Sequence, residues 1–131
     1  MSALPIPVAF YNGRGDVVTL NERFTRLLGY TLEDIPTVDE WFRKAYPDEH
    51  YRDQVAKAWA GRVRDVAGRG VETPAGEVRV TCKSGEVRTL AISGVTIGQD
   101  LLVTMIDVTE ARTLQEQLSL AARLAARDSC S

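Results

Sequence analysis

The chain has 131 residues and a net charge of −2, and 44% of its residues are apolar and 26% are charged. Such a length suits a single domain with a core of its own. The small negative charge offers no basic surface for phosphates, so we expect no nucleic-acid partner. The two cysteines, Cys82 and Cys130, are too few and too widely spaced for a disulfide framework or a zinc site, and sparse cysteine is typical of a reducing cytoplasm.

Neither a secretion signal nor a membrane-spanning segment is predicted. The N-terminus has no basic start and no long apolar run. The longest apolar stretch, 101–108, contains Thr104 and Asp107 and is far shorter than the ~20 residues of a membrane helix. We therefore expect a cytoplasmic domain without membrane contact of its own, in a parent protein that another segment could anchor.

The N-terminal third predicts a strand pair followed by short helices. The β-favouring runs 8–11 and 17–20 flank a turn rich in Asn and Gly. A helix over 22–28 follows, with Asn21 as its cap and Gly29 as its stop.

Three more helices are expected before the pattern changes. Thr31 is predicted to cap a short helix over 32–35. Thr37 and Glu40 have the spacing of a capping box, which begins a second helix. Asp48 is predicted to cap a longer helix that runs to about residue 67, since its apolar residues recur at intervals of three and four.

From residue 77 the apolar residues alternate with polar ones, as in strands. Strands are predicted over 77–82, 87–97 and 101–108, the last apolar enough to lie inside the sheet with little of either face in water. Thr109 is predicted to cap a last helix. The order predicts an α+β fold: a five-stranded antiparallel sheet with short helices on one face and a C-terminal exit helix. We expect a domain over 1–108 and a signalling helix over 109–131 whose end is frayed.

Four segments resemble the PAS domain family, in particular its PAS/PAC type. They are, in chain order, Asn21–Ile35 around Gly29-Tyr30-Thr31, Tyr46–His50, Glu77–Gly85, and Asp107–Glu110. The segments have the order and the separations of that family, and the resemblance extends over about residues 6 to 112.

The resemblance implies the fold just described and a module that senses a small ligand, a cofactor or a partner. Such modules relay their state through the C-terminal helix to an effector. The chain carries no kinase or cyclase motif, so we expect this domain not to be an enzyme. The expected function is the signal-sensing input domain of a bacterial two-component sensor histidine kinase, acting in a phosphorelay. The alternative is a dimerisation module of a diguanylate cyclase or another signalling protein, which binds no ligand.

A third possibility is a small enzyme with a steroid-isomerase-like fold, since such a fold could share the curved sheet. It would need a buried pair of Asp or Tyr side chains in its cavity. Such a pair cannot be built from Asp107 and a single tyrosine, and no catalytic residues are predicted.

The cofactor, if there is one, is not identified by the sequence. Flavin-binding relatives carry an Asn-Cys-Arg-Phe motif that is absent here, and Cys82 instead has the pattern of a small apolar strand residue. His50, the single histidine, falls in the first turn of a helix, where an exposed or capping role is favoured over heme ligation. One histidine cannot form a metal site, so no metal ligands are predicted.

Aromatic residues on two consecutive helices are candidates for a ligand pocket. Most of them are expected to be ordinary core residues, since aromatic side chains at helical spacing usually are. Arg62 lies near the apolar stripe of the long helix; it would need a carboxylate or an anionic ligand if it pointed inward, and otherwise would reach water at the edge. The pocket candidates are Trp41, Phe42, Tyr46, Tyr51, Trp59 and Arg62.

Asp107 and Thr109 stand where the last strand meets the exit helix. An acid at the end of an apolar strand is costly unless it is paired or hydrated. We hypothesise that these two residues form a latch that couples strain in the sheet to the orientation of the helix. An ordinary helix cap is the alternative, and the two roles are compatible.

The exit helix carries an apolar seam, formed by Leu114, Leu118, Ala121 and Ala125 at intervals of four, three and four. This spacing favours pairing with a second copy of the chain in a homodimer. Two heptads are marginal alone, so the sheet or the N-terminal segment is expected to contribute. The alternative is that the seam packs against its own domain.

Overall fold

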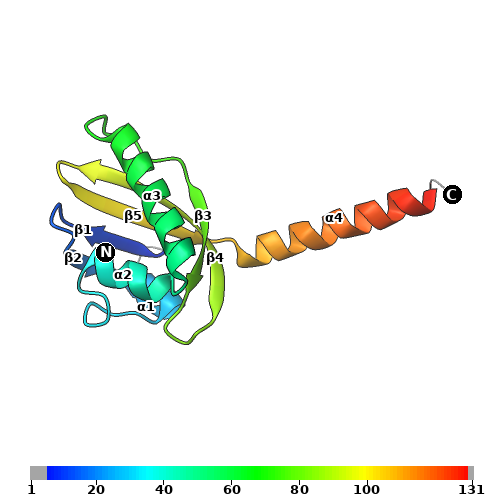
Figure 1. Ribbon diagram of the computed structural model, residues 1–131, viewed down its shortest axis with the longest axis horizontal. Coiled ribbons are helices and arrows are strands. Elements are labelled where there is room, and N and C mark those ends of the chain that lie inside the picture. Colours follow the sequence, from blue (N-terminus) through cyan, green and yellow to red (C-terminus); the bar gives the residue numbers. More distant parts are fainter. Residues whose placement is uncertain (1–5, 130–131) are drawn as a thin grey trace.

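The computed structural model describes residues 6–129, which form one sheet, three helices packed against it and a fourth that projects from it (Figure 1). The expected frayed end and Cys130 lie outside the residues described. The elements in chain order are β1 (Val8–Tyr11), β2 (Val17–Leu20), α1 (Glu22–Leu28), α2 (Val38–Ala45), α3 (Glu49–Val66), β3 (Gly76–Thr81), β4 (Val87–Ile97), β5 (Asp100–Asp107) and α4 (Thr109–Ser129).

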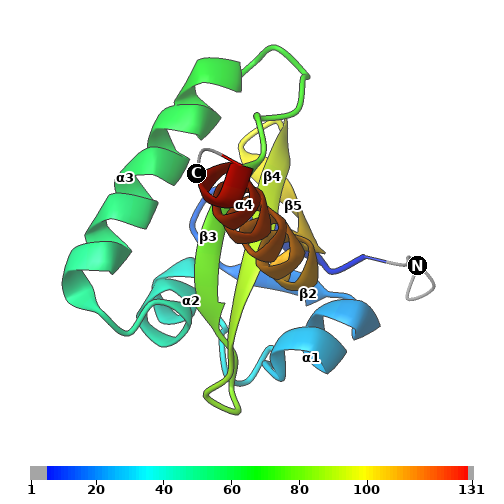
Figure 2. The ribbon, with the colours of Figure 1, turned by 90° about the vertical axis from the view of Figure 1, so that its right-hand side faces the viewer.

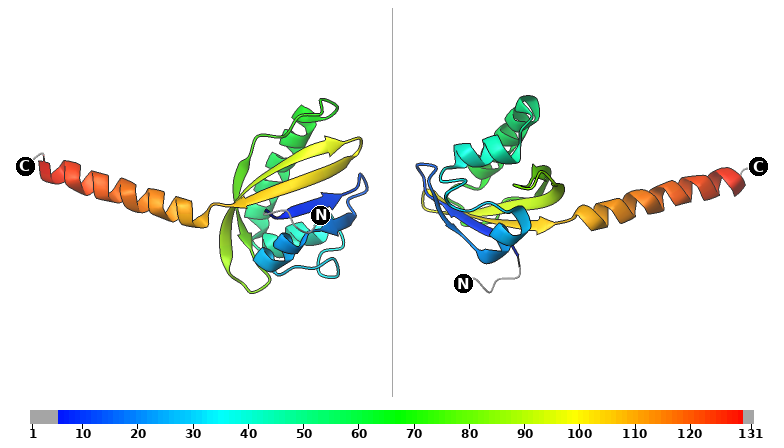
Figure 3. Two further views of the ribbon diagram at one scale, coloured as in Figure 1. Left: turned by 180° about the vertical axis from the view of Figure 1, so that it is seen from behind. Right: turned by 90° about the horizontal axis from the view of Figure 1, so that it is seen from below.

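The five strands form one antiparallel sheet in the order β2-β1-β5-β4-β3. This confirms the predicted α+β class. β5 lies at the centre, paired with β1 through Ala9↔Val103 and with β4 through Ile92↔Met105. Seen from behind, the sheet lies in front of α2 and α3 (Figure 3, left).

The two faces of β5 differ in solvent exposure more than its sequence suggests. Leu101, Val103 and Met105 point toward the helices and are buried. On the opposite face Ile106 is 54% exposed. The prediction of a central strand is confirmed, but not that both of its faces are hidden from water: α1, α2 and α3 supply residues to the inner face only.

Local capping explains where the first helices begin and end. The Asn21 side chain accepts a hydrogen bond from the backbone of Phe24, and Gly29 ends α1 with φ of 83°, a left-handed conformation that favours glycine. Thr37 caps α2 by accepting from the backbone of Glu40, as predicted. Asp48 precedes α3 at the cap position but makes no side-chain capping bond.

The helix expected over 32–35 is instead a turn. Its backbone bonds run from Asp34 and Ile35 back to the Thr31 carbonyl, and the Asp34 carboxylate accepts from the Thr31 backbone and from Lys83. Hydrogen bonds from Thr31 and Lys83 lower the pKa of Asp34 to about 2. Pro36 follows directly, so the segment is too short to continue as a helix.

Asn21 joins the N-terminal segment to α1, and its loss should destabilise the domain. Its side chain accepts from the backbone N–H groups of Val8 (2.9 Å) and Phe24 (3.0 Å) and donates to the carbonyl of Ile6 (2.8 Å). Asn21→Ala removes these bonds at a site only 9% exposed. We expect the free energy of unfolding in urea to fall by about 2–3 kcal/mol.

Asn21→Asp serves as the control because it keeps the acceptor oxygen and removes the donor to Ile6. Its loss should be smaller than that of the alanine variant. A change under about 0.5 kcal/mol for Asn21→Ala would contradict the role assigned to this side chain.

Candidate functional site

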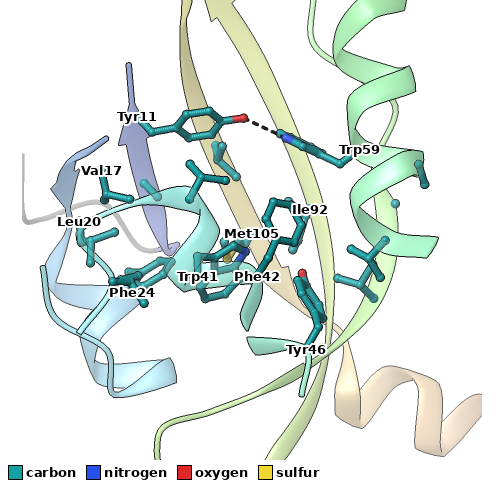
Figure 4. A pocket seen from close by; sticks show the side chains of 18 of the residues that line it. Tyr11, Val17, Leu20, Phe24, Trp41, Phe42, Tyr46, Trp59, Ile92 and Met105 are labelled. Carbon is teal, nitrogen blue, oxygen red and sulfur yellow. Dashed lines mark hydrogen bonds between the residues drawn. The ribbon is translucent and has the colours of Figure 1, made fainter. Parts of the chain in front are cut away.

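A cavity lies between the helices α1–α3 and the inner face of the sheet (Figure 4). Its volume is about 70 Å³. Ile92 of β4 and Val103 and Met105 of β5 form the floor, while Trp41 and Phe42 of α2 lie across from them. The wall is therefore mostly apolar, and it is built by segments far apart in the sequence.

Aromatic rings form one side of this cavity. The ring centroid of Trp41 lies 5.6 Å from that of Phe24 and 6.0 Å from that of Tyr46. Burial raises the pKa of Tyr46 well above its usual range, with a further contribution from Tyr51, and a hydrogen bond with Trp41 opposes the rise. The Tyr46 hydroxyl therefore stays neutral.

Two long side chains of α3 reach the sheet at glycines. The ring of Trp59 lies against Gly94 of β4, where a Cβ atom would come within 2.9 Å of it. The guanidinium of Arg62, one turn further on, lies against Gly76 of β3, where a Cβ atom would overlap it. Because these strand positions lack side chains, Trp59 and Arg62 occupy the space between α3 and the sheet.

A hydrogen bond crosses the cavity from α3 to β1. The Trp59 indole Nε1 donates to the Tyr11 hydroxyl at 2.9 Å (Figure 4). Burial raises the pKa of Tyr11, and this hydrogen bond opposes the rise. Tyr11 was not singled out from the sequence. The alternation of 8–11, which places Ala9 and Tyr11 on the same inward face, is the signal that could have identified it.

Of the six predicted pocket residues, Trp41, Phe42, Tyr46, Trp59 and Arg62 line the cavity, and Tyr51 does not. The Tyr51 hydroxyl accepts a hydrogen bond from the backbone of Arg79, whose guanidinium lies 4.9 Å from the Tyr51 ring centroid. Tyr51 thus joins the start of α3 to β3. The predicted roles as core residues and as pocket residues are compatible, because these aromatic side chains both pack against the core and border the cavity.

The second feature is the junction between β5 and α4. Asp107 Oδ1 accepts from the backbone of Thr109 (2.9 Å) and from its hydroxyl (2.6 Å). The Thr109 hydroxyl in turn accepts from the backbone of Thr89 in β4 at 2.9 Å. Arg88 Nη1 donates to Asp107 Oδ2 at 2.7 Å. We call Arg88, Thr89, Asp107 and Thr109 the junction network.

Thr109 is not the N-cap that its sequence position suggests. The first helical hydrogen bond runs from Arg112 to the carbonyl of Val108, so Val108 is the cap residue and Thr109 the first residue of α4. The capping acceptor is the Asp107 carboxylate. Burial works to raise the pKa of Asp107, but hydrogen bonds from Thr109 and Arg88 outweigh it and hold the pKa below its usual range.

A further ion pair joins α4 to β3. Arg112, in the first turn of α4, donates to both carboxylate oxygens of Glu77. This hydrogen bond lowers the pKa of Glu77. The pairing was not predicted, since 35 residues separate the partners and only the sheet brings them together.

The predicted seam of α4 is open to solvent. Leu114 is 59% and Leu118 71% exposed, and Ala121 and Ala125 are exposed as well. The helix extends away from the sheet in the side views (Figures 1 and 3) and points toward the viewer in Figure 2, which contradicts the alternative in which the seam packs on its own domain. Leu120 and Leu124, not named from the sequence, are also exposed and widen the apolar stripe.

Neither His50 nor Cys82 borders the cavity. His50 is exposed, with its Nε2 3.3 Å from Gln54, and Cys82 is buried, which raises the pKa of its thiol. Within residues 6–129 there is no group of three or more His, Cys, Asp or Glu side chains arranged to hold a metal. None of the helices described in that range is both long and apolar enough to span a bilayer.

The fold matches several solved structures. A light-oxygen-voltage receptor described as RNA-binding superposes with a TM-score of 0.68 at 18% identity, over 97% of this chain and 36% of that one. The sensory box histidine kinase/response regulator of Burkholderia thailandensis gives 0.63 at 18% identity, over 92% and 90%. The N-terminal domain of a diguanylate cyclase with a PAS/PAC sensor from Marinobacter aquaeolei gives 0.64 at 13% identity, over 81% and 97%.

At these identities the structural likeness is one of fold, and this chain spans only about a third of the first of these structures. No curated protein sequence matches the chain significantly. A sequence model of the PAS fold, however, matches residues 17–104, which is well over half of the chain. With its sheet order, its helix-covered cavity and its exit helix, the chain belongs to the PAS domain family, whose members are sensory modules of signalling proteins.

Proposed function

We propose that this domain is the input domain of a bacterial two-component sensor histidine kinase, which relays a ligand- or partner-induced change through α4. The observation that carries the proposal is the junction network. Only Val108 separates β5 from α4. The Asp107 carboxylate that caps the helix also binds Arg88 of β4, and the Thr109 hydroxyl in the first turn of α4 binds the backbone of Thr89 in the same strand. A shift between β4 and β5 therefore reaches the base of α4 directly.

The cavity and the junction are connected by the two central strands. β4 contributes Ile92 to the cavity and Thr89 to the junction network; β5 contributes Met105 and Asp107. A ligand that favours one arrangement of β4 against β5 would shift the population of two junction states. The Glu77–Arg112 pair supports this relay, because it binds α4 to a third strand.

A homodimer is part of the proposal. The seam at Leu114, Leu118, Ala121 and Ala125 repeats every three to four residues and is exposed over its length. A second copy of α4 would cover it, and the exposed outer face of β5 at Ile106 supplies further apolar surface. Rotation of paired helices then carries the change toward an effector.

We place the effector in the same parent protein, C-terminal to α4, and the domain in the cytoplasm, where sparse cysteine is usual. The diguanylate cyclase reading is the second candidate, favoured by the fold likeness to a cyclase sensor domain. Incubation of the parent protein with radiolabelled ATP distinguishes them: label on a histidine supports the kinase. Production of cyclic di-GMP from GTP, without labelled protein, would support the cyclase instead.

Replacing Asp107 by Asn should destabilise the domain in a pH-dependent way. Because the pKa of Asp107 is held low in the folded protein, its charge stabilises the fold above its unfolded pKa of ~3.9, and this contribution fades as the pH falls through the folded value. At pH 7 we expect Asp107→Asn to reduce the free energy of unfolding by about 1–3 kcal/mol.

The difference between the two proteins should shrink below about pH 4, measured by urea unfolding at several pH values. Asp53→Asn is the matched control, since Asp53 is exposed on α3 and makes no side-chain bond to any residue described. An equal effect of both substitutions, or a difference that stays constant with pH, would argue against the junction network.

The dimer is tested on α4. Leu118→Glu places a charge in the middle of the seam, whereas Ser119→Glu adds the same charge on the opposite side of the helix. In sedimentation equilibrium we expect the seam variant to be monomeric at concentrations where the native chain and the control still dimerise. Equal dimerisation of all three proteins would remove the seam from the proposal.

A further inference from the structure

The cavity is lined by one charged side chain and by no carboxylate. That side chain is Arg62, which is half-buried. Within residues 6–126, no hydrogen bond or ion pair satisfies its guanidinium, which lies flat against Gly76. A cation partly removed from water and without a counter-charge favours an anion beside it.

The second polar group facing the cavity is also a donor. The Tyr11 hydroxyl accepts from Trp59, so its own proton is available for donation, and no acceptor for it occurs among the residues described. Arg62 and Tyr11 thus present donors from two walls of the cavity, and the Tyr46 hydroxyl, which also borders it, can donate or accept. A complementary ligand brings acceptor oxygens.

The apolar remainder of the wall and the size of the cavity limit the polarity and the length of the rest of the ligand. Phe42, Ile92 and Met105 are apolar and offer nothing to a second charge. A volume of about 70 Å³ holds roughly five water molecules, so only a short chain fits without rearrangement.

We propose that the cavity binds a short-chain monocarboxylate, with on the order of four to six carbons. Its carboxylate pairs with the Arg62 guanidinium, and its alkyl chain lies among the apolar side chains of the floor. This inference rests on the proposed sensory function and names its ligand class. A ligand bound there could also act on α4, because the Arg62 guanidinium of α3 lies against Gly76 of β3, and Arg112 of α4 binds the same strand through Glu77.

Titration calorimetry of the 131-residue chain tests the proposal with two probes of matched shape, valerate and its neutral amide, pentanamide. We expect valerate to bind once per chain, about tenfold to a hundredfold more tightly than pentanamide, as a charge-assisted hydrogen bond provides. Both ligands should show the negative heat-capacity change of apolar burial.

Three variants test whether Arg62 is the residue that pairs with the carboxylate of valerate. Arg62→Gln should bind valerate and pentanamide equally, whereas Arg64→Gln, the same change at an exposed site on the same helix, should retain the preference. Gly76→Ala keeps the net charge but displaces the guanidinium, and should also weaken the preference. Far-ultraviolet circular dichroism of each variant confirms that it is folded.

Each result has a distinct meaning. Equal binding of both probes to the native chain overturns the carboxylate assignment and leaves a sensor of neutral ligands. Retention of the valerate preference in Arg62→Gln and Gly76→Ala overturns the role of Arg62. Absence of binding by both probes overturns the ligand class, while the junction network and the dimer seam are judged separately, from the unfolding of Asp107→Asn and the sedimentation of the seam variants.

Discussion

The rest of the structure depends on the position of β5 at the centre of the sheet. Its backbone pairs with β1 on one side and β4 on the other, so it holds together the two halves of a sheet whose strands are separated in sequence by three helices. Its inward side chains, among them Val103 and Met105, form the floor of the cavity. Its last residue, Asp107, begins the junction with α4. One strand therefore borders the cavity and carries the exit helix.

The approach of α3 to the sheet depends on two missing side chains. Gly94 admits the ring of Trp59, and Gly76 admits the guanidinium of Arg62. Neither glycine needs an unusual backbone conformation, since positive φ values occur only at other glycines of the described chain. Their role is steric, and it lets a tryptophan and an arginine occupy an inner layer that short aliphatic side chains would otherwise fill.

The attachment of α4 is polar, while its exposed stripe is apolar. At the base, Asp107 and Arg88 form a charge-assisted pair that is only partly exposed. Arg88 Nε also lies 2.6 Å from the Glu86 carboxylate, close enough for an ion pair but without the alignment of a hydrogen bond. Beyond the first turn, the leucines of α4 are exposed, and no domain residue from position 6 onward covers them. Directional bonds thus set the orientation of α4 at its base, and the apolar stripe along the rest of the helix remains available to a partner.

The sequence by itself determined the elements whose signals are local. Asn21 and Gly29 mark the ends of α1, and the Thr37–Glu40 box begins α2. Alternation from residue 77 predicts β3 and β4, and a nearly continuous apolar run predicts β5, because capping and strand patterns act within a few residues. The prediction of a helix over 32–35 is wrong, since a capping residue indicates where a helical turn begins but not how many residues continue it.

Only the tertiary structure decided which side chains meet. Trp59 with Tyr11, Arg62 with Gly76, and Arg112 with Glu77 are contacts across 48, 14 and 35 positions of the chain. Tyr51, which shares the helical spacing of the pocket residues, binds Arg79 instead because it lies at the start of α3, beside the edge strand β3. Local patterns specify which face a residue takes, and strand order and helix placement specify what that face touches.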